Sequence, residues 1–265
     1  MIMTAVNALI YQHFRSDEAP VIDELNDLIN QAENEYRPVL SHFLNPRELF
    51  IAQTLVNTHD EVKLKSFGGV TTAERKRALF FPTYYTPTLE DYQLVLMEIE
   101  YPQKFAVLSH GSILGTLVNS GIQREVLGDI ITDSTRWQFA LEAPLVPFLQ
   151  EQVTRIGRVK VRLVQKDLTE AVNQISEWEE VNDTVASLRA DALVSHFYGL
   201  SRKHAKELIR AHKVHLNWAL LEKPDYELAD YDILSVRGYG RIKLNEQFGL
   251  SKKGKLKISA AILKK

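Results

Sequence analysis

The sequence has no cysteine among its 265 residues, and no apolar stretch approaches the ~20 residues that a helix needs to span a bilayer. The first absence excludes disulfides, thiolate metal sites and cysteine nucleophiles. Residues 1–20 also lack the basic, apolar and small-residue order of a signal peptide. These absences predict a cytoplasmic protein without a membrane partner.

Glycine and proline are scarce as well, with 12 and 9 residues in a chain that is 45% hydrophobic and 25% charged. This is the composition of a globular protein, and the length allows two or three domains of roughly 100–150 residues each. The eight histidines are scattered, and His212 and His215 are too isolated from carboxylates to indicate a metal site. We therefore expect neither a metal nor a cofactor.

Charge is divided unevenly along the chain. Residues 185–265 carry 16 Lys and Arg against 8 Asp and Glu, a local charge of +8, whereas residues 1–184 carry 16 against 26, a local charge of −10. This asymmetry indicates that the C-terminal region meets an anionic partner. The anionic partner could be nucleic acid, anionic lipid or an acidic protein. A basic surface without a partner is the alternative.

Residues 1–82 are predicted to form a mainly helical domain. Apolar residues recur at helical spacing over residues 22–29 and again over residues 49–56, and Asn45 is the expected N-cap of the second helix. A short strand is expected over residues 62–67.

A brief helix is expected next, capped by Thr71 or Thr72 and running to Ala78. It would carry the consecutive basic residues Arg75 to Arg77. Three consecutive charges wrap around a helix instead of sharing one face, which favours a solvated turn.

Residues 83–166 are predicted to form a ferredoxin-like domain. Their patterns follow the order β-α-β-β-α-β, which is typical of a split βαβ sandwich. Many RNA-binding domains share this architecture, and so do many enzymes, while the aromatic-rich strands of an RNA recognition motif are absent. The expected strands cover 94–99, 127–132, 136–141 and 159–164, and the expected helices cover 112–120 and 144–155.

This middle domain is a candidate RNA platform. Gly115, inside its first predicted helix, indicates either close packing or the approach of a ligand's backbone. Residues 167–184, where Trp178 lies among glutamates, are predicted to be an acidic connector. The weaker candidates for RNA contacts are Lys104, His110, Arg124 and Arg136.

Residues 185–265 contain the most informative pattern. One helix is expected to open near Leu188 and to end at Gly199, and Ser201 is the expected cap of a second helix. At roughly 100° per residue, the apolar residues of the second helix fall in one arc and its cations in another. The apolar set is Ala205, Leu208 and Ile209, and the cationic set is Arg202, Lys203, Lys206 and Arg210.

The place of two cations argues for a ligand. Arg202 and Lys203 lie at the start of the helix, where the backbone dipole makes each of them unfavourable by ~0.3–1 kcal/mol. A bound phosphate would make the two cations favourable, because it accepts hydrogen bonds from backbone N–H groups and from both side chains. Because salt screens exposed cations, a purely structural helix face is the alternative.

The segments LRADALVSHFYGLSRKHAKELI, KVHLN and DYDILSVRGYGR resemble the αL RNA-binding motif, the domain named for ribosomal protein S-four. The resemblance implies two helices and a small curved sheet, with the second helix and the adjoining strand facing RNA. Where the motif usually has glycine before the valine strand, this sequence has His212, which tolerates φ > 0 better than a β-branched residue. The expected RNA-binding residues are Arg189, Ser201, Arg202, Lys203, Lys206, Arg210, Lys213, Asn217, Arg237 and Arg241.

Nearly the whole chain resembles the YlmH family, on the segments FGGVTTAERKRALFFP and SHGSILGTLVNSGIQREVLGDI. This resemblance implies an N-terminal domain, a ferredoxin-like RNA-binding middle domain and a C-terminal αL domain with a basic tail. It further implies a cytoplasmic, non-catalytic factor of ribosome-associated quality control that holds peptidyl-tRNA on the large ribosomal subunit. Its partners would be rRNA and tRNA, with no small-molecule substrate.

Enzymes are the main rival, because αL motifs also accompany catalytic domains. A pseudouridine synthase needs an Arg-Leu-Asp loop outside the motif, and no such loop is found; Asp191 inside the motif is predicted to make a local structural hydrogen bond. A synthetase of the tyrosyl-tRNA type needs nucleotide-binding signatures that are absent, and residues 250–254 are predicted to form a basic turn. An RNA-modifying enzyme with an unrecognised site and a cell-division scaffold remain alternatives.

Overall fold

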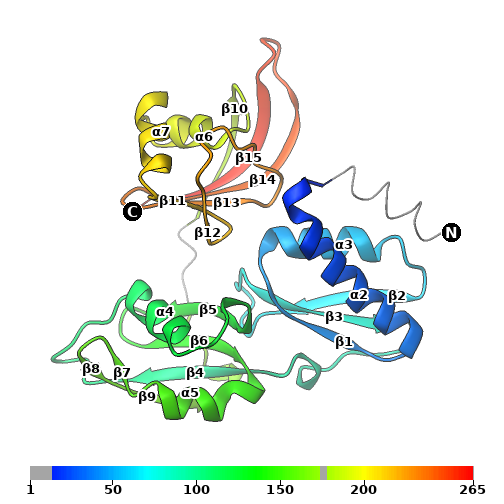
Figure 1. Cartoon of the computed structure of the whole chain (residues 1–265), viewed down its shortest axis with the longest axis vertical. Helices are drawn as coiled ribbons and strands as arrows, with labels where there is room; N and C mark the ends of the chain where they lie inside the picture. The colour runs from blue at the N-terminus through cyan, green and yellow to red at the C-terminus, as the bar shows by residue number, and fades with distance from the viewer. Residues whose placement is uncertain (1–13, 174–177, 265) are drawn as a thin grey trace. The chain divides into compact units, whose positions relative to one another are not determined.

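The computed structural model describes residues 14–173 and 178–264 (Figure 1). The chain divides into two compact units, Met1–Ile175 and Ser176–Lys265, and the fold class is α+β. Within the described ranges, no helix combines the length and the apolar character needed to cross a membrane.

The N-terminal part of the first unit packs two helices on a three-stranded antiparallel sheet, whose strand order is β1-β3-β2. Asn45 caps α3 as predicted, because its side chain accepts hydrogen bonds from the backbone N–H groups of Arg47 and Glu48. The elements are η1 (Ser16–Glu18), α2 (Ala19–Glu35), β1 (Val39–Leu44), α3 (Pro46–Val56), β2 (Val62–Phe67) and β3 (Lys76–Pro82).

The helix predicted to run to Ala78 is wrong, since this segment enters β3 at Lys76. β3 is the central strand of its sheet and is buried almost throughout, so its apolar residues form a continuous run without alternation. Strand β1 was also not predicted, and the description of this domain as mainly helical therefore omits its sheet.

Arg75 and Arg77 are buried, so the predicted solvated turn is wrong as well. Arg75 donates to the carbonyl oxygens of Phe43 at 2.6 Å and Leu127 at 3.2 Å, which joins the N-terminal part to the middle part of the unit. Arg77 donates to the carbonyl oxygen of Ser41 at 2.8 Å. Both guanidinium groups are buried because carbonyl oxygens from distant segments satisfy their donors.

The middle part of the unit has the predicted element order. Its four-stranded sheet has the order β5-β6-β4-β9, and every neighbouring pair is antiparallel. The second helix is shorter than predicted, and a small β7–β8 hairpin lies between it and β9. The elements are η2 (Glu90–Tyr92), β4 (Leu94–Glu100), α4 (His110–Asn119), η3 (Arg124–Val126), β5 (Leu127–Thr132), β6 (Trp137–Glu142), η4 (Ala143–Leu145), α5 (Val146–Gln152), β7 (Arg155–Ile156), β8 (Val159–Lys160), β9 (Arg162–Lys166) and η5 (Leu168–Glu170).

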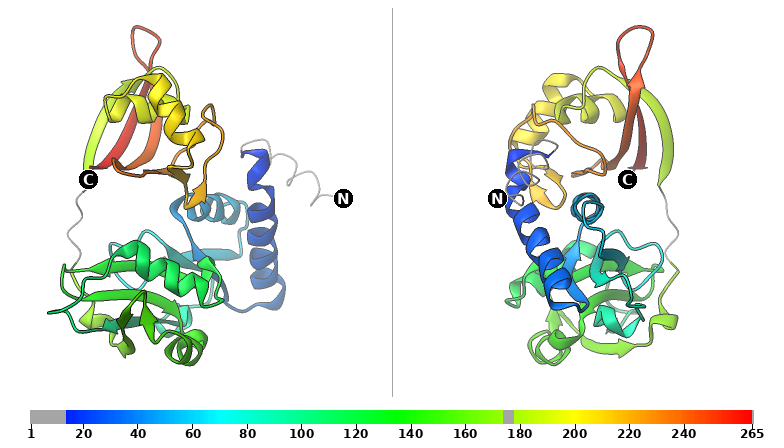
Figure 2. Two further views of the ribbon diagram at one scale, coloured as in Figure 1. Left: turned by 60° about the vertical axis from the view of Figure 1, so that its left-hand side comes forward. Right: turned by 90° about the vertical axis from the view of Figure 1, so that its right-hand side faces the viewer.

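The second unit is a six-stranded antiparallel sheet with two helices over it (Figures 1 and 2). Its strand order is β10-β15-β14-β13-β11-β12, and its core joins Leu193 of α6 and Leu208 of α7 to Ile242 and Ile258 of the sheet. The elements are β10 (Glu179–Val185), α6 (Ala190–Phe197), α7 (Arg202–Arg210), β11 (Val214–Leu216), β12 (Ala219–Leu220), β13 (Ile233–Val236), β14 (Gly240–Leu250) and β15 (Leu256–Lys264).

Two predicted boundaries change here. Much of the predicted connector is strand β10, which pairs with β15 from Glu179 to Val185, so the C-terminal unit begins before residue 185. The predicted basic tail is strand β15, which lies between β10 and β14. Polar residues predominate in β10, and its backbone pairing is therefore not visible as an apolar pattern in the sequence.

Candidate nucleic-acid interface

Helix α7 has the two faces that its sequence predicts. Gly199 turns the chain with φ +63° after α6, and the Ser201 side chain accepts a hydrogen bond from the His204 backbone N–H to cap α7. Ala205, Leu208 and Ile209 are buried in the core of the unit. The cations of the same helix therefore lie on its solvent side.

Asp191, at the start of α6, organises part of this cationic face. It is fully buried, and Arg202 donates to its Oδ1 at 2.7 Å. Arg189 donates to the same carboxylate at 3.2 and 3.3 Å, and Lys206 Nζ lies 3.7 Å from Oδ2. Three cations meet one carboxylate, so the cluster keeps an excess of positive charge while its side chains are held in place. The predicted local hydrogen bond of Asp191 is confirmed.

The pKa of Asp191 reflects these contacts. Burial opposes ionisation, but hydrogen bonds from Arg189 and Arg202 outweigh it and hold the pKa of this carboxyl below its usual range. The ionised carboxylate therefore stabilises the folded unit above the unfolded pKa of about 4. This stabilisation is lost as the pH falls through the folded-state pKa.

Asp191→Asn is expected to lower the free energy of unfolding by about 1–3 kcal/mol at pH 7, because it replaces charged hydrogen bonds with neutral ones. Urea denaturation of wild type and variant at pH 7, 5 and 3 would measure the difference. The difference is expected to shrink as the pH falls below about 4, because Asp191 then binds a proton in the unfolded chain while it is still ionised in the folded unit. A difference that stayed the same from pH 7 to pH 3 would contradict this role for the ionised carboxylate.

A second group of cations is exposed and makes no ion pair within residues 14–173 and 178–264. It consists of Lys203, Arg210, Lys213 and Arg237. The turn that follows β13 lies beside the end of α7, because the Arg237 backbone N–H donates to the Lys213 carbonyl oxygen at 2.8 Å. The Tyr239 ring packs on Tyr198 at 5.4 Å, which fixes the same turn against α6. These cations are available to a polyanion.

Two predicted contacts have structural partners instead. Asn217 donates to Asp232 at 2.8 Å and accepts from the Ile233 backbone N–H at 2.9 Å, so its side chain ties the β11–β12 turn to β13. The guanidinium of Arg241 lies over the rings of Trp178 and Trp218, at 5.2 and 5.7 Å from their centroids. Neither tryptophan was singled out as its partner from the sequence, because the three residues are far apart along the chain.

His212 has φ +56°, which confirms the expected left-handed turn between α7 and β11. Its side chain is exposed.

The weaker candidates in the middle domain differ from one another. Arg124 donates to the carbonyl oxygen of Leu127 at 2.5 Å, and burial lowers its pKa to about 10, so it is a structural residue of the first unit. Arg136 pairs with Asp133 at 2.9 Å. Lys104 and His110 are exposed, in the loop after β4 and at the start of α4.

Gly115 on α4 is not a close-packing position, since nothing lies within 4 Å of where its Cβ would be, and the same holds for Gly111. The close-packing interpretation of Gly115 is therefore wrong. The sequence interpretation missed Asp129. Its carboxylate accepts a hydrogen bond from the backbone N–H of Glu74 at 2.5 Å, and burial raises its pKa to about 6.

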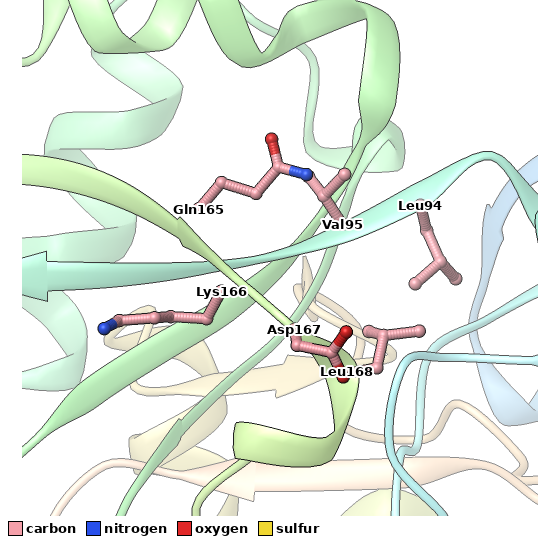
Figure 3. Close-up of a pocket in the computed structure, with 6 residues that line it drawn as sticks. All are labelled: Leu94, Val95, Gln165, Lys166, Asp167 and Leu168. Atoms are coloured by element: carbon pink, nitrogen blue, oxygen red, sulfur yellow. The ribbon is translucent and has the colours of Figure 1, made fainter.

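A hollow of the first unit lies where β4 begins and β9 ends (Figure 3). Lys166 and Asp167 contribute its charged side chains, beside the apolar Leu94 and Leu168. Lys166 lies 3.9 Å from Glu170, and Asp167 accepts from Thr169 to cap η5, so both charges have structural partners. Among the residues described, no group of three or more His, Cys, Asp or Glu side chains has metal-binding geometry.

The fold and this surface define a multidomain α+β protein whose C-terminal unit presents a cationic helix face. Two sequence models of the YlmH family match the chain, "YlmH, N-terminal" at residues 17–85 and "Putative RNA-binding domain in YlmH" at residues 87–170. The ribosome-associated protein quality control protein P2 of Bacillus subtilis (strain 168) is 37% identical over 250 residues, which cover 94% of this chain and 97% of that protein.

A solved structure gives a further comparison. The cell division protein ylmH from Streptococcus pneumoniae shares 34% sequence identity with a TM-score of 0.54, and the match covers 62% of this chain and 99% of that one. The chain belongs to the YlmH family, which confirms the family predicted from its sequence.

Proposed function

We propose that this protein binds structured RNA as a non-catalytic factor of ribosome-associated quality control. The observation that carries the proposal is the α7 face, where Asp191 holds two cations of the helix in place and Lys203 and Arg210 are exposed. Cations held on a rigid helix bind phosphates at little cost in side-chain entropy. The name of the Bacillus subtilis relative and the RNA-binding description of the middle-domain model support this function.

The domain assignments support the same proposal. We infer that residues 83–166 form a ferredoxin-like RNA-binding domain, since strand order β5-β6-β4-β9 with antiparallel neighbours is the arrangement of a split βαβ sandwich. The second unit is proposed to be an αL domain, with α7 and the strand after it facing RNA. Gly111 and Gly115 of α4, which have nothing within 4 Å of their Cβ positions, leave room for an RNA backbone on the middle domain.

We further propose that the RNA is rRNA of the large ribosomal subunit together with tRNA, and that the protein stabilises peptidyl-tRNA there. Two separate surfaces, on the middle domain and on the C-terminal unit, suit two RNA partners. Phosphate contacts would make the affinity depend on salt, and the shape of the domains would select folded RNA over a bare duplex.

Sucrose-gradient sedimentation of the tagged full-length protein from cells tests this function, with sequencing of the RNA that accompanies it. Migration with large subunits, together with enrichment of tRNA, is the expected result. Migration only at the top of the gradient, without RNA, would overturn the proposal.

A cell-division scaffold is the second candidate, because the solved relative from Streptococcus pneumoniae is named a cell division protein. A scaffold would keep its protein partners after RNase treatment, whereas an RNA-dependent factor would lose them. An RNA-modifying enzyme, the remaining alternative, would leave a modified base in rRNA or tRNA that mass spectrometry can detect after incubation.

A further inference from the structure

The β14–β15 hairpin extends beyond the helices and the other strands of its unit (Figure 2). Strand β10 reaches only Val185, which pairs with Leu256, so the segment between Leu250 and Leu256 has no third strand beside it. The hairpin tip is ordered by its own hydrogen bonds: the Ser251 N–H donates to the Lys255 carbonyl oxygen at 2.7 Å, and the Lys255 N–H donates to Ser251 Oγ at 3.0 Å. We call residues 246–257 the arm.

The arm concentrates positive charge. Lys252, Lys253, Lys255 and Lys257 are all exposed, and Glu246 is the acid of the segment. Lys252, Lys253 and Lys257 make no ion pair within the described parts of the chain, while Lys255 acts electrostatically on Asp183. The predicted basic turn at residues 250–254 is confirmed, but the function proposed for α7 makes no use of it.

The arm also exposes large apolar side chains. Phe248 is 50% exposed and Leu250 is 62% exposed. Gln247 pairs with Ile258 and Gly249 pairs with Lys257, so Phe248 is the extra residue of a β-bulge, and Gly249 takes φ +137° to form it. A bulge of this kind redirects a side chain out of the regular pairing. The arm therefore carries an exposed aromatic ring and four exposed lysines, which suits a partner that has both flat bases to stack on the ring and negative charge.

We propose that the arm is a second RNA-binding element, in which Phe248 stacks on an unpaired base and the tip lysines contact the flanking phosphates. The inference rests on the proposed RNA-binding function and adds a subsite to it. Unpaired bases in loops and bulges of folded RNA stack on aromatic side chains, whereas a regular duplex keeps its bases stacked inside. Two exposed apolar side chains bury too little area for stable attachment to a membrane.

The test measures binding of the full-length protein to two fluorescent RNA probes over a range of KCl concentrations. One probe is a stem–loop with an unpaired adenine loop, and the other is a fully paired duplex of equal length. Lys252→Gln, Lys253→Gln and Lys255→Gln are combined in one variant, and the matched control carries the same three charge changes at the exposed Arg37, Lys63 and Lys65, which lie outside the two proposed RNA-binding domains.

The arm variant is expected to bind the stem–loop at least tenfold more weakly than the control. Its slope of log K against log salt is expected to be shallower by about two units, as for the loss of about two phosphate contacts. Phe248→Leu keeps an apolar side chain but removes the ring, and it is expected to weaken stem–loop binding by roughly tenfold while duplex binding stays the same. Phe248→Trp is expected to retain binding. Equal melting temperatures would confirm that every variant is folded.

The outcomes distinguish failure of the arm proposal from failure of the proposed RNA-binding function. If the arm variant and Phe248→Leu bind the stem–loop as the control does, while wild type binds it well, the arm proposal is overturned and the proposed function stands. If wild type binds neither probe nor purified large-subunit rRNA, both are overturned. If the arm variant loses binding only to phosphatidylserine vesicles, the arm is a lipid contact and the RNA proposal for it is wrong.

Discussion

Replacing Lys203, Arg210 and Lys213 together by Gln is expected to weaken binding to large-subunit rRNA by about 100-fold at low salt. These cations are exposed and have no ion pair within residues 14–173 and 178–264, so their loss leaves no buried charge behind. Each phosphate contact that is lost removes about one unit from the slope of log K against log salt. Fluorescence anisotropy at several KCl concentrations would measure both the affinity and the slope.

The choice of residues follows from the structure. Arg202 and Lys206, which the sequence groups with Lys203, both contact buried Asp191, so an alanine triplet at these three positions would also destabilise the unit. The set Lys203, Arg210 and Lys213 avoids this problem. The variant with Gln at Arg37, Lys63 and Lys65 again serves as the control for net charge. Unchanged affinity and slope in a folded variant would show that the α7 face does not bind RNA.

Leu208→Ala is expected to cost about 2–5 kcal/mol of unfolding free energy in the second unit. Leu208 lies on the buried face of α7 with 5% exposure, in the core that includes Leu193 and Val214. Truncation removes apolar burial and leaves a cavity that the surrounding helices and strands fill only in part. Urea denaturation followed by tryptophan fluorescence in a Trp137→Phe background reports on this unit, because the two remaining tryptophans, Trp178 and Trp218, both belong to it.

Leu250→Ala is the matched control for this substitution. It makes the same chemical change at a leucine that is 62% exposed, so a change within about 0.5 kcal/mol is expected. Equal urea midpoints for the two variants would show that Leu208 is not a core residue. Because α7 presents its cations from the opposite side of this buried face, a destabilised Leu208→Ala variant is also expected to lose RNA affinity as it unfolds.

Local features of the second unit could be predicted from the sequence, because local forces form them. Ser201 caps α7 by a hydrogen bond to a residue three positions away, and Gly199 ends α6 with a conformation that glycine adopts readily. The apolar arc around Leu208 required only the period of a helix. The βαββαβ order of the middle domain likewise follows from alternating patterns of short segments.

Other features depend on contacts between distant segments. Strand β3 was mistaken for a helix because a central strand buried on both faces loses the alternation that identifies an exposed one. Strand β10 was mistaken for a connector because backbone groups make its pairing with β15. The polar side chains of β10 give little indication of that pairing. Pairing partners are chosen by the tertiary structure, not by the strand itself.

The charged residues likewise have some properties that the sequence predicts and others that depend on distant contacts. Sequence alone determined that the C-terminal region is basic and that α7 has one apolar and one cationic face, since both follow from composition and helical period. Which of these cations are available to a ligand depends on the tertiary structure. Arg202 donates to Asp191, Arg241 stacks on two tryptophans, and buried Arg75 donates to backbone carbonyl oxygens. A buried or stacked charge needs such partners, and folding brings them from elsewhere in the chain.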